Sequence, residues 1–523
     1  MNEIAIFRNL KIKPVILVLI AIAVIKLLLH LFTAQGAQGY GYFRDELYNI
    51  SAASRLSFGY VDIPPLVPLI MAVNKAILGT SLFAIHILPA VIGAVTVFMG
   101  GMLALELGGN FTAAVLSSVI FLAAPHLTAV DSIFTYDSFD LLLCAVFFFY
   151  LIKFLKTEDK NYWLIIGLIS GLGLLIKLSI IFYGFAMTAA LLATGKRKIL
   201  ASKKLWIGGI ICLAFISPFI IWQALHGFPI KDYWVNYALN KTFHASPLQF
   251  LLMNFMTLNL TCLPILAAGL AVLLFWKPLK PYRTLGLMFI ILFIVFIIMR
   301  MKYYLLIAMF FPLIASGSVY FEHLMAKISV KWISAGTSII YSCILILSGI
   351  IFIPYDVPVL SPQDFINYSS HITRSNVRIE RNELGALPQI FADRLGWEDL
   401  AKTVSMVYLG LPPEDRKKCM VFAQNYGEAG AIDLYKSKYS LPGIICGHLS
   451  WYFWRPADIN PDVIMIVIGG KEDDHKRSFG SVEKMSVFPN PYVVPFESKL
   501  PIWVCRDLKI PVSEIWGRIK HYD

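Results

Sequence analysis

Long apolar stretches, separated by short polar segments, fill the chain as far as residue 355. A helix that crosses a bilayer needs roughly 20 predominantly apolar residues, and about eleven stretches of 14 to 26 residues therefore predict membrane spans. They lie at residues 14–33, 81–105, 111–130, 138–154, 162–176, 178–194, 205–225, 250–275, 285–298, 303–320 and 332–354. The fifth and sixth belong to one apolar run, which we divide at Lys177 and Ser179 because polar side chains interrupt it there.

After residue 355 the pattern changes to short apolar runs that alternate with helix-like segments. Strands are predicted at residues 419–423, 444–446, 463–468 and 502–505, and helices at residues 397–409 and 427–436. Strands that alternate with helices are typical of a small α/β unit. The sequence therefore predicts two domains, a helical membrane domain at residues 1–355 and a water-soluble α/β domain at residues 356–523.

Charge follows the same division and predicts the orientation. Charged residues number 37 among the first 355 and 41 among the last 168. The whole chain is 15% charged, well below the roughly 25% of soluble proteins, which excludes an ordinary cytoplasmic protein. Five basic clusters, at residues 8–13, 153–160, 196–204, 277–283 and 327–331, fall on one side of the membrane if there are eleven spans. The positive-inside rule then places the N-terminus inside and the C-terminal domain outside a cytoplasmic (inner) membrane. The net charge of +12 is thus a signal of topology and indicates no nucleic-acid partner.

The loop after the first predicted span carries the densest polar chemistry. Asp45 and Glu46 are adjacent acids beside a membrane span, and such a pair can supply a general base or hold a divalent cation. An interfacial helix with a solvated acidic face is the alternative. Further along the loop, Asp62, Pro64 and Pro65 are predicted to shape and stiffen the chain.

A second acidic position and a set of cations are predicted on the same outer side. Asp137 and Asp140 open the fourth span, where Asp137 is the natural N-cap, and Lys177 lies between the fifth and sixth spans. Cations that oppose the topological bias need a local partner. The predicted phosphate-binding cations are Arg55, Lys177, Arg300 and Lys302.

One chemistry uses both kinds of residue. A lipid phosphate needs cations at the membrane surface, and a hydroxyl acceptor needs a carboxylate to take its proton. Transfer of a sugar from a polyprenyl phosphate requires both, and a single displacement would invert the anomeric carbon. The phosphate leaving group needs charge stabilisation and no protonation.

These residues resemble a known family. The blocks Tyr42-Phe-Arg-Asp-Glu-Leu-Tyr48 and Gly59-Tyr-Val-Asp-Ile-Pro-Pro-Leu66 are similar to glycosyltransferase family 39, the bacterial relatives of the protein O-mannosyltransferases. Further similar segments are Lys302-Tyr-Tyr304 and, after residue 356, Asn425-Tyr-Gly-Glu-Ala-Gly430. The resemblance implies a GT-C fold, a polyprenyl-phosphate sugar donor and a lipid, glycan or protein acceptor. It also implies that Asp45 is the catalytic aspartate, which acts as general base, with Glu46 as its partner. The chain departs from the family pattern at Ile63 and His86, where His and Arg are common.

Other interpretations stay open at this stage. A lipid or sugar transporter without transferase chemistry would also have many spans and lysines inside apolar stretches, such as Lys26. An aromatic run at residues 451–454 could stack on sugar, although core packing is favoured. The turn at residues 423–427 could hold an anion at a helix start, although a plain strand-to-helix turn is favoured.

Metal and disulfide chemistry receive little support from the sequence. No dedicated cofactor is predicted, and a divalent cation would be held by Asp45 and Glu46. The chain has no CxxC spacing, which argues against structural zinc. Cysteines 419, 446 and 505 lie in the predicted outside domain, where a disulfide, for example between 419 and 446, is permitted.

Overall fold

The computed structural model describes residues 2–34, 37–241, 246–372, 383, 385–456, 459–460 and 462–523, with the backbone alone for residues 2–13, 37 and 513. The chain forms two compact units. The first, called the membrane unit below, comprises Met1–Gln35, Ile85–Pro218 and His244–Val357. The second, called the sheet unit, comprises Gly36–Ala84, Phe219–Phe243 and Pro358–Asp523.

The membrane unit is built from apolar helices. Its α-helices are α1 (Asn2–Thr33), α4 (Leu82–Glu106), α5 (Phe111–Leu122), α6 (Pro125–Val130), α7 (Tyr136–Thr157), α8 (Tyr162–Leu174), α9 (Ile180–Ala193), α10 (Lys203–Leu225), α12 (Pro247–Met256), α13 (Leu263–Phe275), α14 (Arg283–Ile298), α15 (Phe310–Ala326) and α16 (Lys331–Asp356). The first three residues of α4 and the end of α10 from Phe219 belong to the sheet unit. Short 3-10 segments include η5 (Tyr303–Met309).

Among the described residues, fewer helices are long enough to cross a membrane than the sequence predicts. Among the described residues, seven helices are long and apolar enough to cross a membrane, or eight if the bent pair at residues 247–275 is one span. Three further predicted spans coincide with shorter apolar helices, α5, α8 and α9. Each of the eleven predicted stretches therefore contains a helix, whereas the number eleven stays a prediction. The break between α8 and α9 lies at residues 175–179, where we divided the apolar run.

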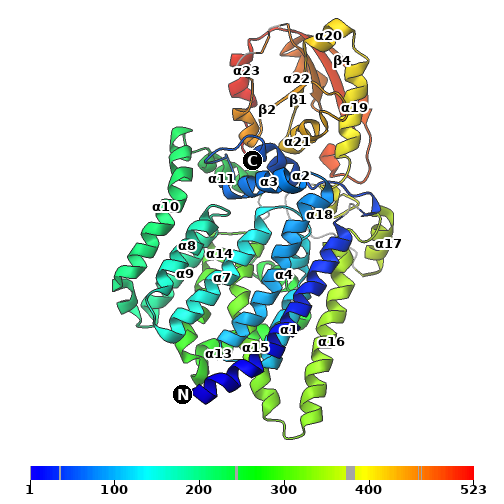
Figure 1. The fold of residues 1–523 in the computed structure, drawn as a ribbon. Helices are drawn as coiled ribbons and strands as arrows, with labels where there is room; N and C mark the ends of the chain where they lie inside the picture. Colours follow the sequence, from blue (N-terminus) through cyan, green and yellow to red (C-terminus); the bar gives the residue numbers. More distant parts are fainter. Residues whose placement is uncertain are drawn as a thin grey trace. The chain divides into compact units, whose positions relative to one another are not determined.

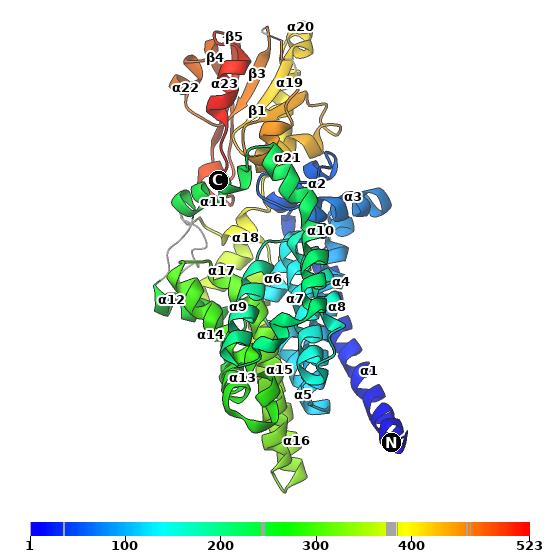
Figure 2. The same ribbon diagram turned by 90° about the vertical axis from the view of Figure 1, so that its left-hand side faces the viewer.

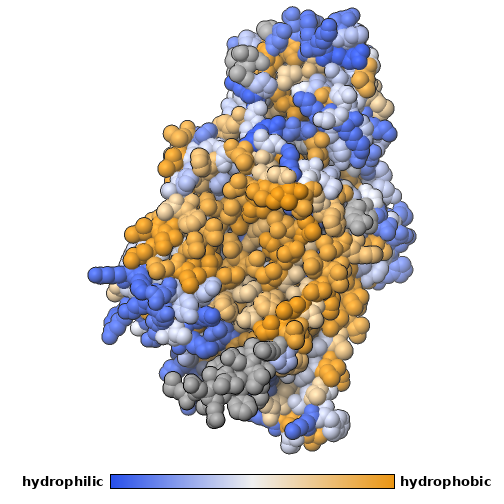
Figure 3. Space-filling view, in the orientation of Figure 1, coloured by the Kyte–Doolittle hydropathy of each residue, from blue (hydrophilic) through white to orange (hydrophobic). Residues whose placement is uncertain are grey.

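Large apolar side chains cover the surface of the membrane unit. Figure 3 shows them as a broad orange belt over its helices, and leucine and isoleucine side chains of α1 and α16 are among the exposed ones. Such a belt is expected where lipid is the solvent. The chain is a multi-span membrane protein. The predicted basic cluster of Arg8, Lys11 and Lys13 lies outside the residues whose side chains the structure describes.

Small residues set the close helix contacts within the membrane unit. A Cβ at Gly269 of α13 would overlap the backbone carbonyl of Leu313 in α15, and a Cβ at Gly317 would overlap that of Ile265. Ser316 also donates a hydrogen bond to the Gly269 carbonyl. Close approach through small residues is a common way for helices to pack in lipid, where no hydrophobic force favours their association.

Lys26 of α1 is paired inside the membrane unit. Its ammonium lies 3.2 Å from an Asp131 carboxylate oxygen and donates a hydrogen bond to Thr128. Lys26 is fully buried, so an unpaired charge there would be costly. This pair joins α1 to the segment between α6 and α7.

The sheet unit combines a five-stranded sheet with helices from three parts of the chain. Its strands are β1 (Cys419–Ala423), β2 (Gly443–Cys446), β3 (Ile464–Ile468), β4 (Phe479–Phe488) and β5 (Leu500–Leu508). The order is β2-β1-β3-β5-β4, with β2, β1 and β3 parallel and with β5 antiparallel to β3 and to β4. Its α-helices are α2 (Arg44–Ala53), α3 (Leu66–Leu78), α11 (Pro229–Asn240), α17 (Pro362–Ile372), α18 (Gln389–Ala392), α19 (Trp397–Leu409), α20 (Pro413–Lys417), α21 (Tyr426–Tyr435), α22 (Glu472–Lys476) and α23 (Val512–Ile519).

Helices cover both faces of this sheet. α19 and α23 lie on opposite sides of it (Figures 1 and 2). On the α23 side, Trp516 packs in a core with Met465, Val467 and Trp503. The predicted α/β fold of this region is confirmed. Strand β4 was not predicted, because it is an edge strand with mostly half-exposed or exposed side chains.

A disulfide between Cys419 and Cys446, which the sequence permits, does not fit the register of the strands. Cys446 pairs with Ala423 on β1, so Cys419 lies four residues away along the strand, about 13 Å. Disulfide-linked Cα atoms are usually less than 7 Å apart. All seven cysteines are free thiols.

Candidate active site

The acidic pair lies in the first turn of helix α2, and the two acids have different surroundings. Glu46 is fully buried, and its carboxylate accepts a hydrogen bond of 2.8 Å from the backbone N–H of Phe43. An acid in the first turn satisfies an N–H that the helix leaves unpaired. Glu46 thus holds the start of α2, and its predicted role as a catalytic partner stays a prediction.

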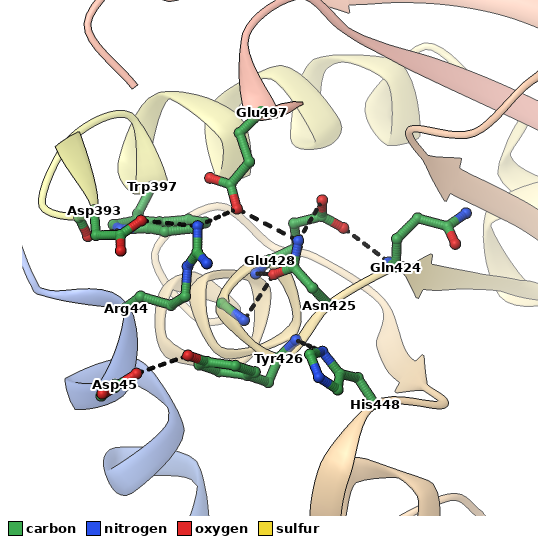
Figure 4. Close-up of polar contacts among 11 residues, drawn as sticks. Arg44, Asp45, Asp393, Trp397, Gln424, Asn425, Tyr426, Glu428, His448 and Glu497 are labelled. Atoms are coloured by element: carbon green, nitrogen blue, oxygen red, sulfur yellow. Dashed lines mark hydrogen bonds and ion pairs between the residues drawn. The ribbon is translucent and has the colours of Figure 1, made fainter. Parts of the chain in front are cut away.

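Asp45 is half-buried and meets a residue from the far end of the chain. Its carboxylate accepts a hydrogen bond of 2.7 Å from the phenol of Tyr426, the first residue of α21 (Figure 4). Burial, followed by the charge of Asp45, raises the pKa of Tyr426 well above its ordinary value. The phenol therefore stays protonated and remains the donor.

Asp62 has a phenol partner of its own. The hydroxyl of Tyr48 donates to Asp62 over 2.8 Å, and the rings of Tyr48 and Tyr426 lie 5.3 Å apart. Burial raises the pKa of Asp62 to about 7, and the nearby charge of Asp45 adds to this. Two acid–phenol pairs, Asp45 with Tyr426 and Asp62 with Tyr48, thus lie side by side at α2. Pro65 immediately precedes α3, which agrees with a structural role for Pro64 and Pro65.

Arg44 is buried in the sheet unit and neutralised there. Its guanidinium lies 2.8 Å from Asp393 and 2.9 Å from Glu497, with the rings of Trp397 and Phe496 within 6 Å (Figure 4). Burial alone would lower the pKa of Arg44, but the two carboxylates raise it. Arg44 therefore ties α2 to two segments of the C-terminal region.

The turn between β1 and α21 is closed by its own side chains. The side-chain oxygen Oδ1 of Asn425 accepts hydrogen bonds from the N–H groups of Gly427 and Glu428, at 2.9 and 3.0 Å. Asn425 thus caps the helix start, which favours the plain turn over an anion site. Burial, followed by the charge of Glu497, raises the pKa of Glu428 to about 8.

Arg55, a predicted phosphate-binding cation, is paired within the sheet unit. Its guanidinium makes two hydrogen bonds to Asp433, of 2.8 and 3.1 Å. It also lies 4.8 Å from the ring of Trp451 and 5.2 Å from that of Trp454. The aromatic run of residues 451–454 therefore packs, in part, around this ion pair. Binding of the donor phosphate by Arg55 stays a prediction.

The membrane unit brings three other predicted residues together. The Lys177 ammonium lies 2.6 Å from the Asp137 carboxylate. Lys177 and Lys302 lie 5.2 and 5.5 Å from the ring of Tyr304, and the ring of Tyr136 lies 4.9 Å from Lys177. Two ammonium groups thus share one aromatic ring. Arg300, two residues before Lys302 in the chain, is exposed.

Asp140 lies one turn beyond Asp137 and faces Ser179. The Ser179 hydroxyl is 3.1 and 3.2 Å from the two carboxylate oxygens. The N-cap of α7 is Thr135, which accepts a hydrogen bond from the N–H of Asp137. The prediction of Asp137 as N-cap was wrong, because Thr135 has the extended backbone and the hydroxyl that the cap position requires.

The geometry offers limited support for metal binding. Glu46 is turned into the cap of α2, away from a shared site with Asp45. Among the described residues, His448, His521 and Asp523 form a group of possible ligands. However, His448 Nδ1 accepts from the Tyr426 N–H, so Nε2 carries the proton and donates to the backbone oxygen of Asp523. Both ring nitrogens are therefore in use. A divalent cation at Asp45 stays a prediction.

Known proteins that are similar to this chain support the fold described above. Residues 62–222 match the family model described as dolichyl-phosphate-mannose-protein mannosyltransferase. No curated protein matches the chain. Two crystal structures of ArnT from Cupriavidus metallidurans, one bound to undecaprenyl phosphate and one in the apo state, each match with a TM-score of 0.58 and 11% sequence identity. In both, the match covers 92% of this chain and 97% of the other. The predicted resemblance and fold class are confirmed. The matched segment begins at Asp62, so Asp45 and Glu46 lie outside it.

Proposed function

We propose that this membrane protein, which has the GT-C glycosyltransferase fold and resembles glycosyltransferase family 39, transfers a sugar from a polyprenyl-phosphate donor to an envelope acceptor outside the cytoplasmic membrane. The observation that carries the proposal is the pair of ammonium groups, Lys177 and Lys302, around the ring of Tyr304. A lipid phosphate needs such charge at the membrane, together with apolar surroundings for its chain.

In the proposed reaction Asp45 acts as the general base. Its carboxylate takes the proton of the acceptor hydroxyl while the hydroxyl oxygen attacks the anomeric carbon. The bond between that carbon and the phosphate oxygen breaks, and the lipid monophosphate leaves with the electron pair. Lys177 and Lys302 stabilise the charge that develops on this phosphate. One displacement inverts the anomeric carbon.

The contacts of Lys26 and Lys177 weaken the case for a transporter. That alternative drew on lysines inside apolar stretches, and Lys26 and Lys177 are each paired with an aspartate, Asp131 and Asp137. The ion pair between Lys26 and Asp131 therefore explains Lys26 as a structural contact within the membrane unit. Movement of a labelled lipid across proteoliposomes without a covalent product would favour the transporter.

The test uses envelope fractions, which supply native acceptors. Radiolabelled polyprenyl-phosphate sugars are added one at a time to fractions that contain the wild type, Asp45→Asn or Asp462→Asn, and the released lipid phosphate is measured. Asp462 is an exposed acid of the sheet unit, and its variant is the matched control. We expect release by the wild type and the control and a loss of at least a hundredfold in Asp45→Asn. Full activity of Asp45→Asn would refute the mechanism, and no release with any donor would refute the function.

A further inference from the structure

The carboxylate proposed to act as the base is held by a residue of the C-terminal region. We propose that Tyr426 is a positioning residue for Asp45, so that the C-terminal region contributes to the catalytic machinery through helix α21. This inference rests on the proposed function. The inference goes beyond the proposed function, because it gives the C-terminal region a role in the chemical step.

Tyr426 is itself held from several sides. It follows Asn425, whose side chain caps α21, and its backbone N–H donates to His448 Nδ1 over 3.3 Å. Its ring lies 5.3 Å from that of Tyr48 and 5.1 Å from that of His448. Figure 4 shows the phenol pointing from α21 toward Asp45. A donor fixed in this way can set the orientation of the carboxylate that it binds.

The helices that carry the two residues are in close contact. A Cβ at Gly430 of α21 would lie 2.7 Å from the Cβ of Leu47, closer than such atoms approach, and 3.0 Å from its carbonyl, which is a tight contact. A Cβ at Gly427 would lie 2.8 Å from both Arg44 and Trp397. Glycine at these positions lets α21 lie directly against α2. This close contact between the two helices holds Tyr426 next to Asp45.

The hydrogen bond from Tyr426 affects catalysis through the charge of the Asp45 carboxylate. A hydrogen bond from a neutral phenol to a carboxylate favours its ionised form, and only the ionised form can accept a proton from the acceptor hydroxyl. The bond also restricts the carboxylate to one orientation, which a general base requires. A buried tyrosine needs a partner for its hydroxyl in any protein, so the test must separate catalysis from packing.

The first variant is Tyr426→Phe, which keeps the ring and removes the hydroxyl. We expect kcat for lipid-phosphate release to fall about 10- to 100-fold, with KM for the donor changed by less than about threefold. We also expect the acidic limb of the pH–activity profile to move to higher pH, because the ionised carboxylate loses a donor. Tyr439→Phe is the matched control, since its phenol binds Glu398 elsewhere in the same unit, and its activity should equal that of the wild type.

A second variant tests the inference without altering either residue. Gly430→Ala should push α21 away from α2 and lower kcat at least about tenfold. Gly443→Ala is its control, because a Cβ there would meet only Met420 at an ordinary 3.5 Å. This pair keeps the inference testable if Tyr426→Phe does not fold.

The outcomes separate the inference from the function on which it rests. If the wild type is active, Asp45→Asn is inactive and Tyr426→Phe matches Tyr439→Phe in rate and pH profile, Tyr426 is not a positioning residue and the proposed function stands. A uniform loss of activity at every pH would assign Tyr426 a packing role and overturn the inference. A wild type that releases no lipid phosphate would refute the proposed function, and an Asp45→Asn variant with full activity would refute the proposed mechanism. The inference would fail in either case.

Discussion

The Lys177 ammonium lies 2.6 Å from the Asp137 carboxylate, although 40 residues separate them in the chain. Lys177 occupies the break between α8 and α9, and Asp137 lies in the first turn of α7. A carboxylate at this distance orients the ammonium and keeps it charged among apolar helices. A donor phosphate would meet a cation that is already in place.

Replacing Lys177 should weaken donor binding. We expect Lys177→Met to raise KM for the polyprenyl-phosphate sugar roughly 10- to 100-fold, the loss that follows from one charge-assisted hydrogen bond. Lys177→Arg, which keeps the charge, should lose less. Lys156→Met is the control, since Lys156 pairs with Glu106 at an exposed position. Initial rates over a range of donor concentrations would show the effect, and an unchanged KM would exclude Lys177 from the phosphate site.

Arg44 should be required for the stability of α2 and α21. It is the buried cation between Asp393 and Glu497, and removing one partner of a buried ion pair costs about 3–5 kcal/mol. In Arg44→Gln we expect faster hydrogen exchange at the amides of both helices. Arg477→Gln, a change to an exposed pair, should leave exchange as it is in the wild type. Equal protection of these amides in Arg44→Gln and Arg477→Gln would show that the buried ion pairs of Arg44 contribute little to stability.

The same cluster should make stability depend on pH. Burial raises the pKa of Glu497 to about 7, so between pH 4.5 and 7 the folded state keeps a proton that the unfolded state has lost. The free energy of unfolding must then fall as pH rises through this window. Glu497→Gln removes the titrating group, and its stability relative to the wild type should increase between pH 5 and pH 8 by up to about 3 kcal/mol.

Thermal melts of both proteins across this range give the measurement. Glu483→Gln, at an exposed position of β4, should run parallel to the wild type. A constant difference between Glu497→Gln and the wild type at all pH values would show that Glu497 does not titrate there.

Close packing in the membrane unit should be sensitive to a single methyl group. A Cβ at Gly269 would overlap the Leu313 carbonyl, and overpacking of this kind costs about 1–3 kcal/mol. We expect Gly269→Ala to lower the melting temperature in detergent, whereas Gly336→Ala, with nothing within 4 Å of the added Cβ, should not. A wild-type melting temperature for Gly269→Ala would mean that α13 and α15 can move apart freely.

Local patterns predicted much of the fold. Strand β1 was predicted at its observed bounds, because a short apolar run between turn residues needs no distant information. Strand β4 escaped prediction because its alternation is obscured by Glu483 and Lys484 at an edge of the sheet. The break at Lys177 was visible because a charge interrupts an apolar run.

Distant partners could not be predicted. Tyr426 follows Asp45 by 381 positions, and nothing near either residue indicates the other. The different surroundings of Asp45 and Glu46 also required the structure. Glu46 caps α2 by accepting a hydrogen bond from the N–H of Phe43. Phe43 occupies the N-cap position, so the Ser or Thr that usually marks such a cap is missing.

The most direct test of the central claim is a product analysis with purified protein in lipid nanodiscs. A polyprenyl-phosphate sugar that is active in envelope fractions is supplied together with extracted acceptor, and lipid monophosphate and new glycosidic bonds are counted by mass spectrometry and NMR. We predict one lipid monophosphate for each bond formed, with the anomeric configuration inverted relative to the donor. Retained configuration, or consumption of the donor without a matching glycosidic bond, would contradict a single displacement to an acceptor.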